Sequence, residues 1–159
     1  MTIHKIKSNE EIIWISKRLK DEGKRIVTTN GSFDILHSAH LHILEKARKQ
    51  GDVLIVLLNS DNSIKKLKGE SRPIIPERER AEMLAGLECV DYVSVFDDDN
   101  PLNLLRDLRP DVHVKGGSFN ENRIAEEKKL LSEWNGEFKN FELENEKSTT
   151  NIIDKIKEI

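Results

Sequence analysis

The sequence predicts an α/β fold, in which a central parallel sheet of about five strands carries helices on both faces. Apolar runs alternate with helical patterns along the chain, which is typical of successive βαβ units. One run, DVLIVLL at 52–58, is almost wholly apolar, as expected for a strand buried on both faces of a parallel sheet. With 159 residues, the chain is long enough for a single domain, 1–159, with a full hydrophobic core.

The helices are predicted from apolar residues at helical spacing and from residues that start or end a helix. The first spans 8–22, where Ser8 can cap it and Gly23 ends it. It belongs to the N-terminal stretch 1–24, which leads into the fold. Pro76 suits the first position of a helix that runs to about residue 88. Further helices are predicted at 38–50, 101–108, 122–134 and 150–159, the last with Ile152, Ile153, Ile156 and Ile159 facing the core.

The strands are predicted from short apolar runs at 25–29, 52–58, 92–96, 111–115 and 137–143. Residues 65–75, which follow the second strand, are predicted to form a basic loop. In parallel sheets of this kind, ligands bind beyond the carboxyl ends of the strands, where the strand order reverses. The first candidate sites are therefore the loops after Thr29, Leu58 and Lys115.

Composition and missing motifs exclude several classes of protein. The net charge is −3, so no overall field attracts nucleic acid, and the single cysteine excludes a disulfide framework. No apolar run is long enough to cross a membrane, and no signal peptide begins the chain. We therefore expect a cytoplasmic protein with neither a membrane nor a nucleic-acid partner. Dehydrogenases and P-loop NTPases are disfavoured, because the chain lacks their glycine-rich motifs.

The segment 28–42, TTNGSFDILHSAHLH, carries the strongest functional signal, because three of the five histidines follow the first strand. His40 shares a helical stripe with apolar residues, so it points inward at the first turn of a helix, and His37 lies one turn earlier. A helix N-terminus offers free N–H groups and a partial positive charge. Two imidazoles beside it predict a phosphate site, which Asn30 and Gly31 let the backbone approach closely.

Other interpretations of these histidines stay open. They can simply cap and pack the helix, and His42, which falls on another helical face, is expected to be solvent-exposed. A zinc site formed by His37, His40 and His42 has less support, because no carboxylate or thiol is placed to complete the ligand set. We therefore predict no protein-bound metal at this segment.

Two stretches after the second strand add cationic candidates. Lys68 and Arg72 lie in the predicted basic loop, where solvation of a surface lysine or arginine is the simplest explanation. Arg80 is more informative, because it shares the buried stripe of the next helix. A buried arginine needs an anionic partner, which is either an internal carboxylate or a ligand phosphate.

Two strand or helix ends near the C-terminus complete the candidates. Ser148, Thr149 and Thr150 open the last helix, and three hydroxyl groups in a row exceed the needs of a cap, so they can hold phosphate oxygens. Lys115 and Gly116 end a predicted strand. This end is either a plain turn or a place where the backbone approaches a nucleotide with Lys115 as a nearby cation.

Six short segments, in this order, resemble the H-x-G-H nucleotidyltransferase superfamily, and most closely the adenylyltransferase domain of bacterial ADP-heptose synthases. They are TNGSFDILHSAH (29–40), LNSD (58–61), KLKGESRPIIP (66–76), LECVDYV (87–93), RPDVHVKGG (109–117) and STTNIIDKI (148–156). The resemblance implies a Rossmann-like nucleotidyltransferase fold. It also implies transfer of AMP from ATP, with Mg²⁺, to a sugar 1-phosphate, D-glycero-β-D-manno-heptose 1-phosphate, with release of pyrophosphate. The partners would be a nucleoside triphosphate and a small phosphorylated acceptor, and the family allows a homodimer.

The resemblance also implies residue roles. His37 and His40 would hold the triphosphate and stabilise the transferring phosphoryl group, and Asn30, Gly31 and Phe33 would lie against the phosphates. Lys68 and Arg72 would lie near the acceptor or leaving phosphates, and Arg80 in the phosphate site. Lys115 and Gly116 would lie beside the nucleotide, and the helix start at Ser148, Thr149 and Thr150 would grip the terminal phosphates. Asp34 is either a carboxylate near magnesium or a structural turn residue.

Two positions depart from the family pattern. The glycine of H-x-G-H is Ala39 here, and the usual G-G-D-[YW] is Gly117-Ser118-Phe119. These departures leave alternatives open: a cytidylyltransferase for glycerol 3-phosphate, choline phosphate or ethanolamine phosphate, an FMN adenylyltransferase, or a nucleotide-binding protein without activity.

Overall fold

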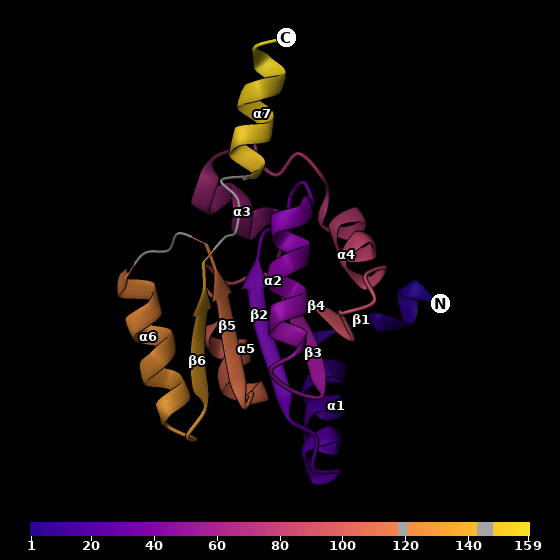
Figure 1. The fold of residues 1–159 in the computed structure, drawn as a ribbon, viewed down its shortest axis with the longest axis vertical. Helices are drawn as coiled ribbons and strands as arrows, with labels where there is room; N and C mark the ends of the chain where they lie inside the picture. The colour runs from indigo at the N-terminus through magenta and orange to yellow at the C-terminus, as the bar shows by residue number, and fades with distance from the viewer. Residues whose placement is uncertain (118–120, 143–147) are drawn as a thin grey trace.

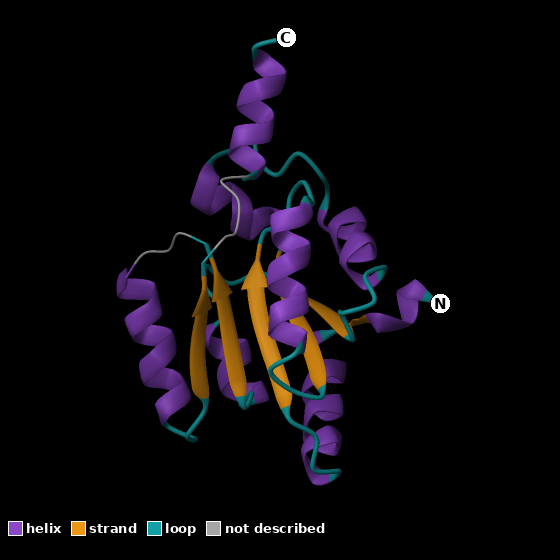
Figure 2. Cartoon of the chain, in the orientation of Figure 1, coloured by secondary structure: helices purple, strands orange, loops and turns teal. Residues whose placement is uncertain are grey.

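The structure is a computed structural model that describes residues 1–117, 121–142 and 148–159. Its strands form one parallel six-stranded sheet with the order β1-β4-β3-β2-β5-β6 and with helices on both faces (Figures 1 and 2). The strands are β1 (Ile6–Lys7), β2 (Ile26–Gly31), β3 (Val53–Asn59), β4 (Tyr92–Phe96), β5 (Val112–Gly116) and β6 (Glu137–Phe141). The predicted fold class is confirmed. The strand that the sequence did not reveal, β1, has two residues, which are too few to leave a pattern.

The helices follow the strands in alternation, as in βαβ units. A short 3₁₀ helix, η1 (Thr2–Lys5), precedes β1. The α-helices are α1 (Asn9–Asp21), α2 (Ser38–Arg48), α3 (Asp61–Lys68), α4 (Glu77–Ala85), α5 (Leu102–Leu108), α6 (Glu121–Ser132) and α7 (Thr149–Lys157). None of these helices is both long and apolar enough to cross a bilayer, within the described part of the chain.

Two hydrophobic layers enclose the sheet, because successive side chains of a strand point to opposite faces. Val27 of β2 packs with α2 and α4 on one face. Its neighbour Ile26 packs with α1, α5 and α6 on the other. β3 is buried along its whole length, as its apolar sequence predicts. Each layer thus fixes one set of helices against the strands whose carboxyl ends carry the site.

The segment predicted as a basic loop begins with a helix, α3. Ser60 caps this helix, since its hydroxyl accepts a hydrogen bond from the Ser63 backbone N–H at 3.0 Å. α3 has two apolar residues, of which Ile64 is fully buried and Leu67 is 40% exposed. Two apolar residues in eight give too short a periodic stripe, which is why the sequence pattern did not reveal α3. Lys65, Lys66 and Lys68 therefore lie on a helix, and the loop proper starts at Gly69.

The C-terminal helix departs from the prediction most clearly. α7 leaves the sheet beyond the carboxyl ends of the strands and projects away from it (Figure 1). Ile152 and Ile153 are half-buried, Ile156 is 60% exposed and Ile159 is fully exposed, so these side chains do not face the core. The prediction failed because helical spacing reveals an apolar face but not what covers it. The predicted end of the preceding strand, Leu143, lies outside the described residues.

Candidate active site

The strand order places a cavity where the chain changes direction across the sheet. From β2, the chain adds β3 and β4 on one side and β5 and β6 on the other. Loops at the carboxyl ends of β2 and β5 therefore diverge, which is where ligands bind in such folds. A cavity of about 340 Å³ opens there. It is lined by Thr29, Asn30, Gly31, Ser32, Phe33, Asp34, His37, His40, Ile43, Lys68, Gly116, Gly117, Ser148, Thr149 and Thr150.

Most of the predicted site residues meet at this cavity. The predicted residues among its lining are Asn30, Gly31, Phe33, His37, His40, Lys68, Gly116, Ser148, Thr149 and Thr150. The loops after Thr29 and Lys115 contribute to the lining, but the loop after Leu58 does not. Arg72 lines an adjoining groove, whereas Arg80 and Lys115 line neither. Ser118 and Phe119, where the sequence departs from the family pattern, lie outside the described residues.

His37 and His40 face one another at the start of α2. Their rings stack with centroids 3.8 Å apart and an interplanar angle of 21°. Phe33 packs against His40, with ring centroids 5.2 Å apart and an interplanar angle of 59°. The stack fixes both imidazoles at the wall of the cavity, as the spacing of the two histidines predicts.

The environment of His40 keeps its imidazole neutral at pH 7. Burial, together with charge repulsion from the nearby His37 and Lys68, lowers the pKa of His40 to about 4. Its Nδ1 atom is buried and has no hydrogen-bond partner among the described residues. A buried polar atom without a partner is costly, so a ligand that hydrogen-bonds to it would recover that free energy.

Two helix N-termini point toward the cavity. His37 is the N-cap residue of α2, and no side chain caps this helix, so its first amide groups remain available. α7 begins on the opposite side, where the Ser148 hydroxyl caps it by accepting from Asn151 N at 3.1 Å. The Thr149 hydroxyl donates to the Ile35 carbonyl at 3.2 Å, which ties α7 to the loop before α2. Two partial positive charges thus converge on one space, which suits an anion.

Close packing shapes the wall between β5 and α2. Gly116 ends β5, and a Cβ atom there would lie 2.1 Å from Cδ1 of Ile43 in α2. Only a glycine lets the strand end pass this close to the helix. Phe33 has a left-handed backbone with φ of 45°, which is unfavourable for an aromatic residue. In this conformation the Phe33 ring contacts His40. The unfavourable backbone conformation of Phe33 thus accompanies a contact that supports the histidine pair.

Asp34 holds the loop that follows α3. Its carboxylate accepts hydrogen bonds from the backbone N–H groups of Ile74 at 2.9 Å and Ile75 at 2.8 Å. It also lies 3.7 Å from the guanidinium of Arg72. Asp34 is therefore the structural residue of the two possibilities that the sequence left open. Among the described residues, no three His, Cys, Asp or Glu side chains are arranged to hold a metal ion.

One lysine of α3 lines both the cavity and a groove beside it. Lys68 lies at the exposed end of α3, where partial desolvation and the charge of Arg72 lower the pKa of its ammonium group. Lys68 also lines the adjoining groove, of about 550 Å³, which runs between the loop after α3 and the outer part of α7. That groove is lined by Lys68, Ser71, Arg72, Ile74, Thr150, Ile153 and Lys157.

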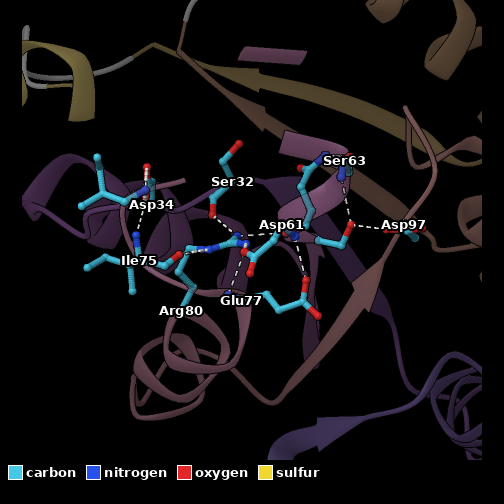
Figure 3. A network of polar contacts seen from close by, with 11 residues as sticks. Ser32, Asp34, Asp61, Ser63, Ile75, Glu77, Arg80 and Asp97 are labelled. Carbon is cyan, nitrogen blue, oxygen red and sulfur yellow. Dashed lines mark hydrogen bonds and ion pairs between the residues drawn. The ribbon is translucent and has the colours of Figure 1, made fainter. Parts of the chain in front are cut away.

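Arg80 does not line the cavity, and the direct phosphate contact predicted for it stays a prediction. Its side chain is fully enclosed, and its guanidinium donates to the carbonyls of Ser32, Asn59 and Ile75 at 2.7–2.9 Å (Figure 3). It also pairs with Asp61 at 2.8 Å. The anionic partner is thus an internal carboxylate. Because Ser32 lines the cavity, Arg80 acts on the site by fixing the loop that surrounds it.

Lys115 is likewise absent from the lining of the cavity. Its ammonium group contacts Asn30 Oδ1 at 3.1 Å and Glu127 Oε1 at 2.8 Å, so its charge is balanced within the protein. Glu127 and His113 were not predicted as site residues. His113 lies two residues before Lys115, on the same face of β5. The available signal was a histidine within the apolar strand pattern DVHVK.

Comparisons with known proteins agree with this geometry. The sequence profile of the Cytidylyltransferase-like family matches residues 28–155. The chain is 48% identical over 153 residues to the bifunctional protein HldE of Geotalea uraniireducens and 47% identical over 153 residues to that of Campylobacter fetus. Each match covers 96% of this chain but 31% of the relative, so the chain spans about a third of the length of these proteins.

Solved structures show the same fold. The lipopolysaccharide core biosynthesis protein from Thermoplasma volcanium has a TM-score of 0.63 and 26% identity, over 78% of this chain and 99% of that chain. The pantoate-beta-alanine ligase from Francisella tularensis has a TM-score of 0.64 and 16% identity, over 97% of this chain and 78% of that chain, which shows the fold alone. The family profile covers most of the chain, and its residues form the switch-point cavity. The chain therefore belongs to the Cytidylyltransferase-like family and is a nucleotidyltransferase.

Proposed function

We propose that this chain transfers AMP from ATP to a sugar 1-phosphate, namely D-glycero-β-D-manno-heptose 1-phosphate, and forms ADP-heptose and pyrophosphate. The observation that carries the proposal is the convergence of two helix N-termini and the His37–His40 stack on one cavity. Identity of 48% to an HldE protein, and the fold shared with a lipopolysaccharide core biosynthesis protein, support the sugar phosphate as acceptor.

The proposed reaction is an in-line displacement at the α-phosphorus of ATP. An oxygen of the acceptor phosphate forms a bond to the α-phosphorus while the bond to the bridging β-oxygen breaks, and its electron pair leaves with pyrophosphate. The acceptor phosphate is already an anion near neutral pH, so the reaction needs no general base. The protein contributes positioning and stabilisation of developing charge. This fits a cavity with imidazoles and amide groups, where the Asp34 carboxylate is already occupied by backbone N–H groups.

Each part of the cavity suits one part of the substrates. His37, His40 and the amide groups at the start of α2 would hold the transferring phosphoryl group. The start of α7, with the Thr150 hydroxyl, would hold the β- and γ-phosphates, and Asn30, Gly31 and Phe33 would form the floor beneath them. Gly116 would let the nucleoside pass close to α2.

The acceptor would occupy the rim and the adjoining groove. Lys68 lines both the cavity and the groove, so a phosphate beside it can lie near the α-phosphorus and near Arg72 at once. Ile74 and Ile153 offer apolar contacts to the sugar ring. The groove is therefore large enough for a sugar and positively charged at its inner end.

Magnesium would accompany the nucleotide as part of the substrate. Mg²⁺ usually keeps several water ligands and binds to phosphates through few protein groups. The cavity offers no cluster of free carboxylates among the described residues, since Asp34 is committed to the backbone of Ile74 and Ile75. The ion would then be held by phosphate oxygens and water rather than by a protein site.

A matrix of nucleotides and acceptors tests the proposal. Pyrophosphate release would be measured with ATP or CTP against heptose 1-phosphate, glycerol 3-phosphate, choline phosphate, ethanolamine phosphate and FMN. We expect the highest kcat/KM for ATP with heptose 1-phosphate. A preference for CTP, or for another acceptor, would reassign the substrate within the family. Nucleotide binding without pyrophosphate release from any pair would point to a binding protein instead.

A further inference from the structure

A buried polar network lies directly beneath the floor of the cavity, on the face of the sheet that α6 covers. Its members are Thr28 and Asn30 on β2, His113 and Lys115 on β5, and Glu127 on α6. Thr28 and His113 are fully buried, and Glu127 is 2% exposed. Asn30 is the member that also lines the cavity, so it connects the network to the site.

Five contacts join these residues, and four of them form a closed ring through Asn30, His113, Glu127 and Lys115. Thr28 Oγ1 lies 2.7 Å from His113 Nδ1, and His113 Nε2 lies 3.2 Å from Asn30 Oδ1. Lys115 Nζ lies 3.1 Å from the same Asn30 oxygen. Lys115 Nζ also donates to Glu127 Oε1 at 2.8 Å, and the second Glu127 oxygen lies 3.5 Å from His113 Nε2. Two side chains from β5 therefore converge on one oxygen of Asn30.

The chemistry of the partners fixes the orientation of the Asn30 amide. An ammonium group has only donors, so the Asn30 atom that faces Lys115 must be the oxygen and not the NH₂ group. His113 Nε2 contacts the same oxygen, so it must carry a proton and donate. The other ring nitrogen, Nδ1, then accepts from the Thr28 hydroxyl, which gives one consistent set of donors and acceptors. Burial, which lowers the pKa of His113, favours this neutral imidazole.

We propose that His113 and Glu127 are positioning residues that lock Asn30 with its NH₂ group toward the cavity, as a donor to a phosphate oxygen of the nucleotide. His113 acts directly on the Asn30 oxygen. Glu127 acts through both β5 side chains, because one carboxylate oxygen holds the Lys115 ammonium group and the other lies 3.5 Å from His113 Nε2. The inference rests on the proposed function, since it assigns the group that Asn30 would bind.

The same network explains why Lys115 serves the site indirectly. A lysine held between Glu127 and Asn30 is neutralised and lies below the floor, so it acts on phosphates only through the amide that it orients. The amide oxygen of Asn30 already accepts hydrogen bonds from Lys115 and His113. The nitrogen is therefore the amide atom that can serve a ligand, and Asn30 selects ligand atoms that accept hydrogen bonds.

The first test compares two substitutions of His113. His113→Leu removes both hydrogen bonds, whereas His113→Gln keeps an N–H donor for Asn30 and an oxygen that can accept from Thr28. We expect His113→Leu to weaken ATP binding and lower kcat/KM by about 10- to 100-fold, the scale of a misplaced binding group. His113→Gln should stay within about threefold of the wild type. Ile55→Val, a buried change in the same hydrophobic layer, controls for general loss of stability.

Nucleotide binding must be measured apart from turnover, so that this inference and the proposed function can fail separately. The side-chain NH₂ resonances of Asn30 should shift on addition of ATP in the wild type and in His113→Gln, but not in His113→Leu. If ATP shifts these resonances while no acceptor gives pyrophosphate, the proposed function fails and the positioning role stands.

A second substitution keeps the inference testable if His113→Leu does not fold. Asn30→Asp preserves an oxygen for Lys115 and His113 but replaces the NH₂ donor by a negatively charged oxygen. We expect ATP affinity to fall by about 100-fold or more, the scale of losing one preorganised donor, while the melting temperature stays near that of the wild type. Equal losses in His113→Gln and His113→Leu, or full ATP affinity in Asn30→Asp, would overturn the proposal.

Discussion

Two polar clusters lie at the same edge of the sheet and differ in how their hydrogen bonds are satisfied. His40 stacks on His37, and its buried Nδ1 has no partner among the described residues. Arg80 is equally a polar residue on the buried face of a helix, yet its guanidinium has four protein acceptors. Both residues occupy the first turns of a helix beside an apolar stripe, so their sequence patterns are alike.

The difference in hydrogen bonding indicates that His40 can bind a ligand, whereas Arg80 stabilises the fold. Satisfying Arg80 within the protein fixes the Ser32 carbonyl and the loop at Ile75. Asp34 ties the same two loops from the other side, through the backbone N–H groups of Ile74 and Ile75. We call these contacts of Arg80 and Asp34 the brace. The brace holds the cavity wall in place, while His40 keeps a nitrogen without a hydrogen-bond partner in the described part of the chain. Preorganisation of this kind is what charge stabilisation requires.

The largest expected effect comes from breaking the brace. Arg80→Met should lower the free energy of unfolding by about 3 kcal/mol, because it leaves Asp61 and three carbonyls without their donor. Urea denaturation measures this loss. Arg80→Lys should recover little of it, because an ammonium group cannot reach all four acceptors. Unchanged stability together with weaker ATP binding would instead make Arg80 a phosphate ligand.

At the histidine stack, we expect a substitution to lower turnover and to leave the stability of the fold intact. His40→Ala should lower turnover by about 100-fold, the scale of losing one preorganised donor in a transition state. The free energy of unfolding should stay constant or rise, since the substitution removes a buried atom without a partner. His42→Ala, on another face of the same helix, is the matched control and should keep near wild-type turnover. A normal rate of pyrophosphate release by His40→Ala would contradict the assignment.

The features that were predictable from the sequence depend on residues close together in the chain. Ser8 caps α1 in a capping box with Glu11, and β3 is buried wherever its residues are apolar. The histidine pair also follows from spacing along a single helix. These features depend on residues within a few positions of one another, so a single sequence contains the information.

The partners of buried polar groups were not predictable, because they are distant in the sequence. Arg80 bonds to Ser32, 48 residues away, and Lys115 to Asn30, 85 residues away. Burial of Arg80 was evident from its stripe, but the choice between a carboxylate and a ligand phosphate depended on where Asp61 lies. The exposed face of α7 is a similar case, since spacing alone does not show whether anything covers Ile156.

A smaller loss of stability is expected from a substitution at Gly116, where the end of β5 packs against α2. Gly116→Ala would place a methyl group 2.1 Å from Cδ1 of Ile43, so Ile43 must move toward the cavity. We expect a loss of about 1–3 kcal/mol in the free energy of unfolding, as for other overpacked sites, and weaker ATP binding. Adding Ile43→Val to Gly116→Ala removes the nearest colliding atom, Cδ1, but keeps a methyl group at 2.9 Å, so it should restore part of the stability and part of the ATP binding. Independent, additive effects of the two substitutions would show that this contact does not limit the space.

The smallest expected effect is a pH dependence of stability that arises at the histidine stack. The pKa of His40 is about 4 in the folded protein, against 6.5 for an unperturbed histidine. Between these values the unfolded chain binds a proton that the folded chain does not, so stability falls as the pH drops from about 6.5 toward 4. His113, whose pKa burial also lowers, adds to the fall in the same direction.

His40→Gln isolates the histidine contribution to this pH dependence. The melting temperature of the wild type should drop more between pH 7.5 and pH 5 than that of His40→Gln, and Arg80→Lys should keep the full wild-type slope. Bound ATP should reduce the drop, because phosphate oxygens favour the protonated imidazole and raise the pKa of His40. An NMR titration of the His40 ring, with and without ATP, measures that rise directly. An unchanged His40 pKa with ATP bound would place the phosphates away from the histidine stack.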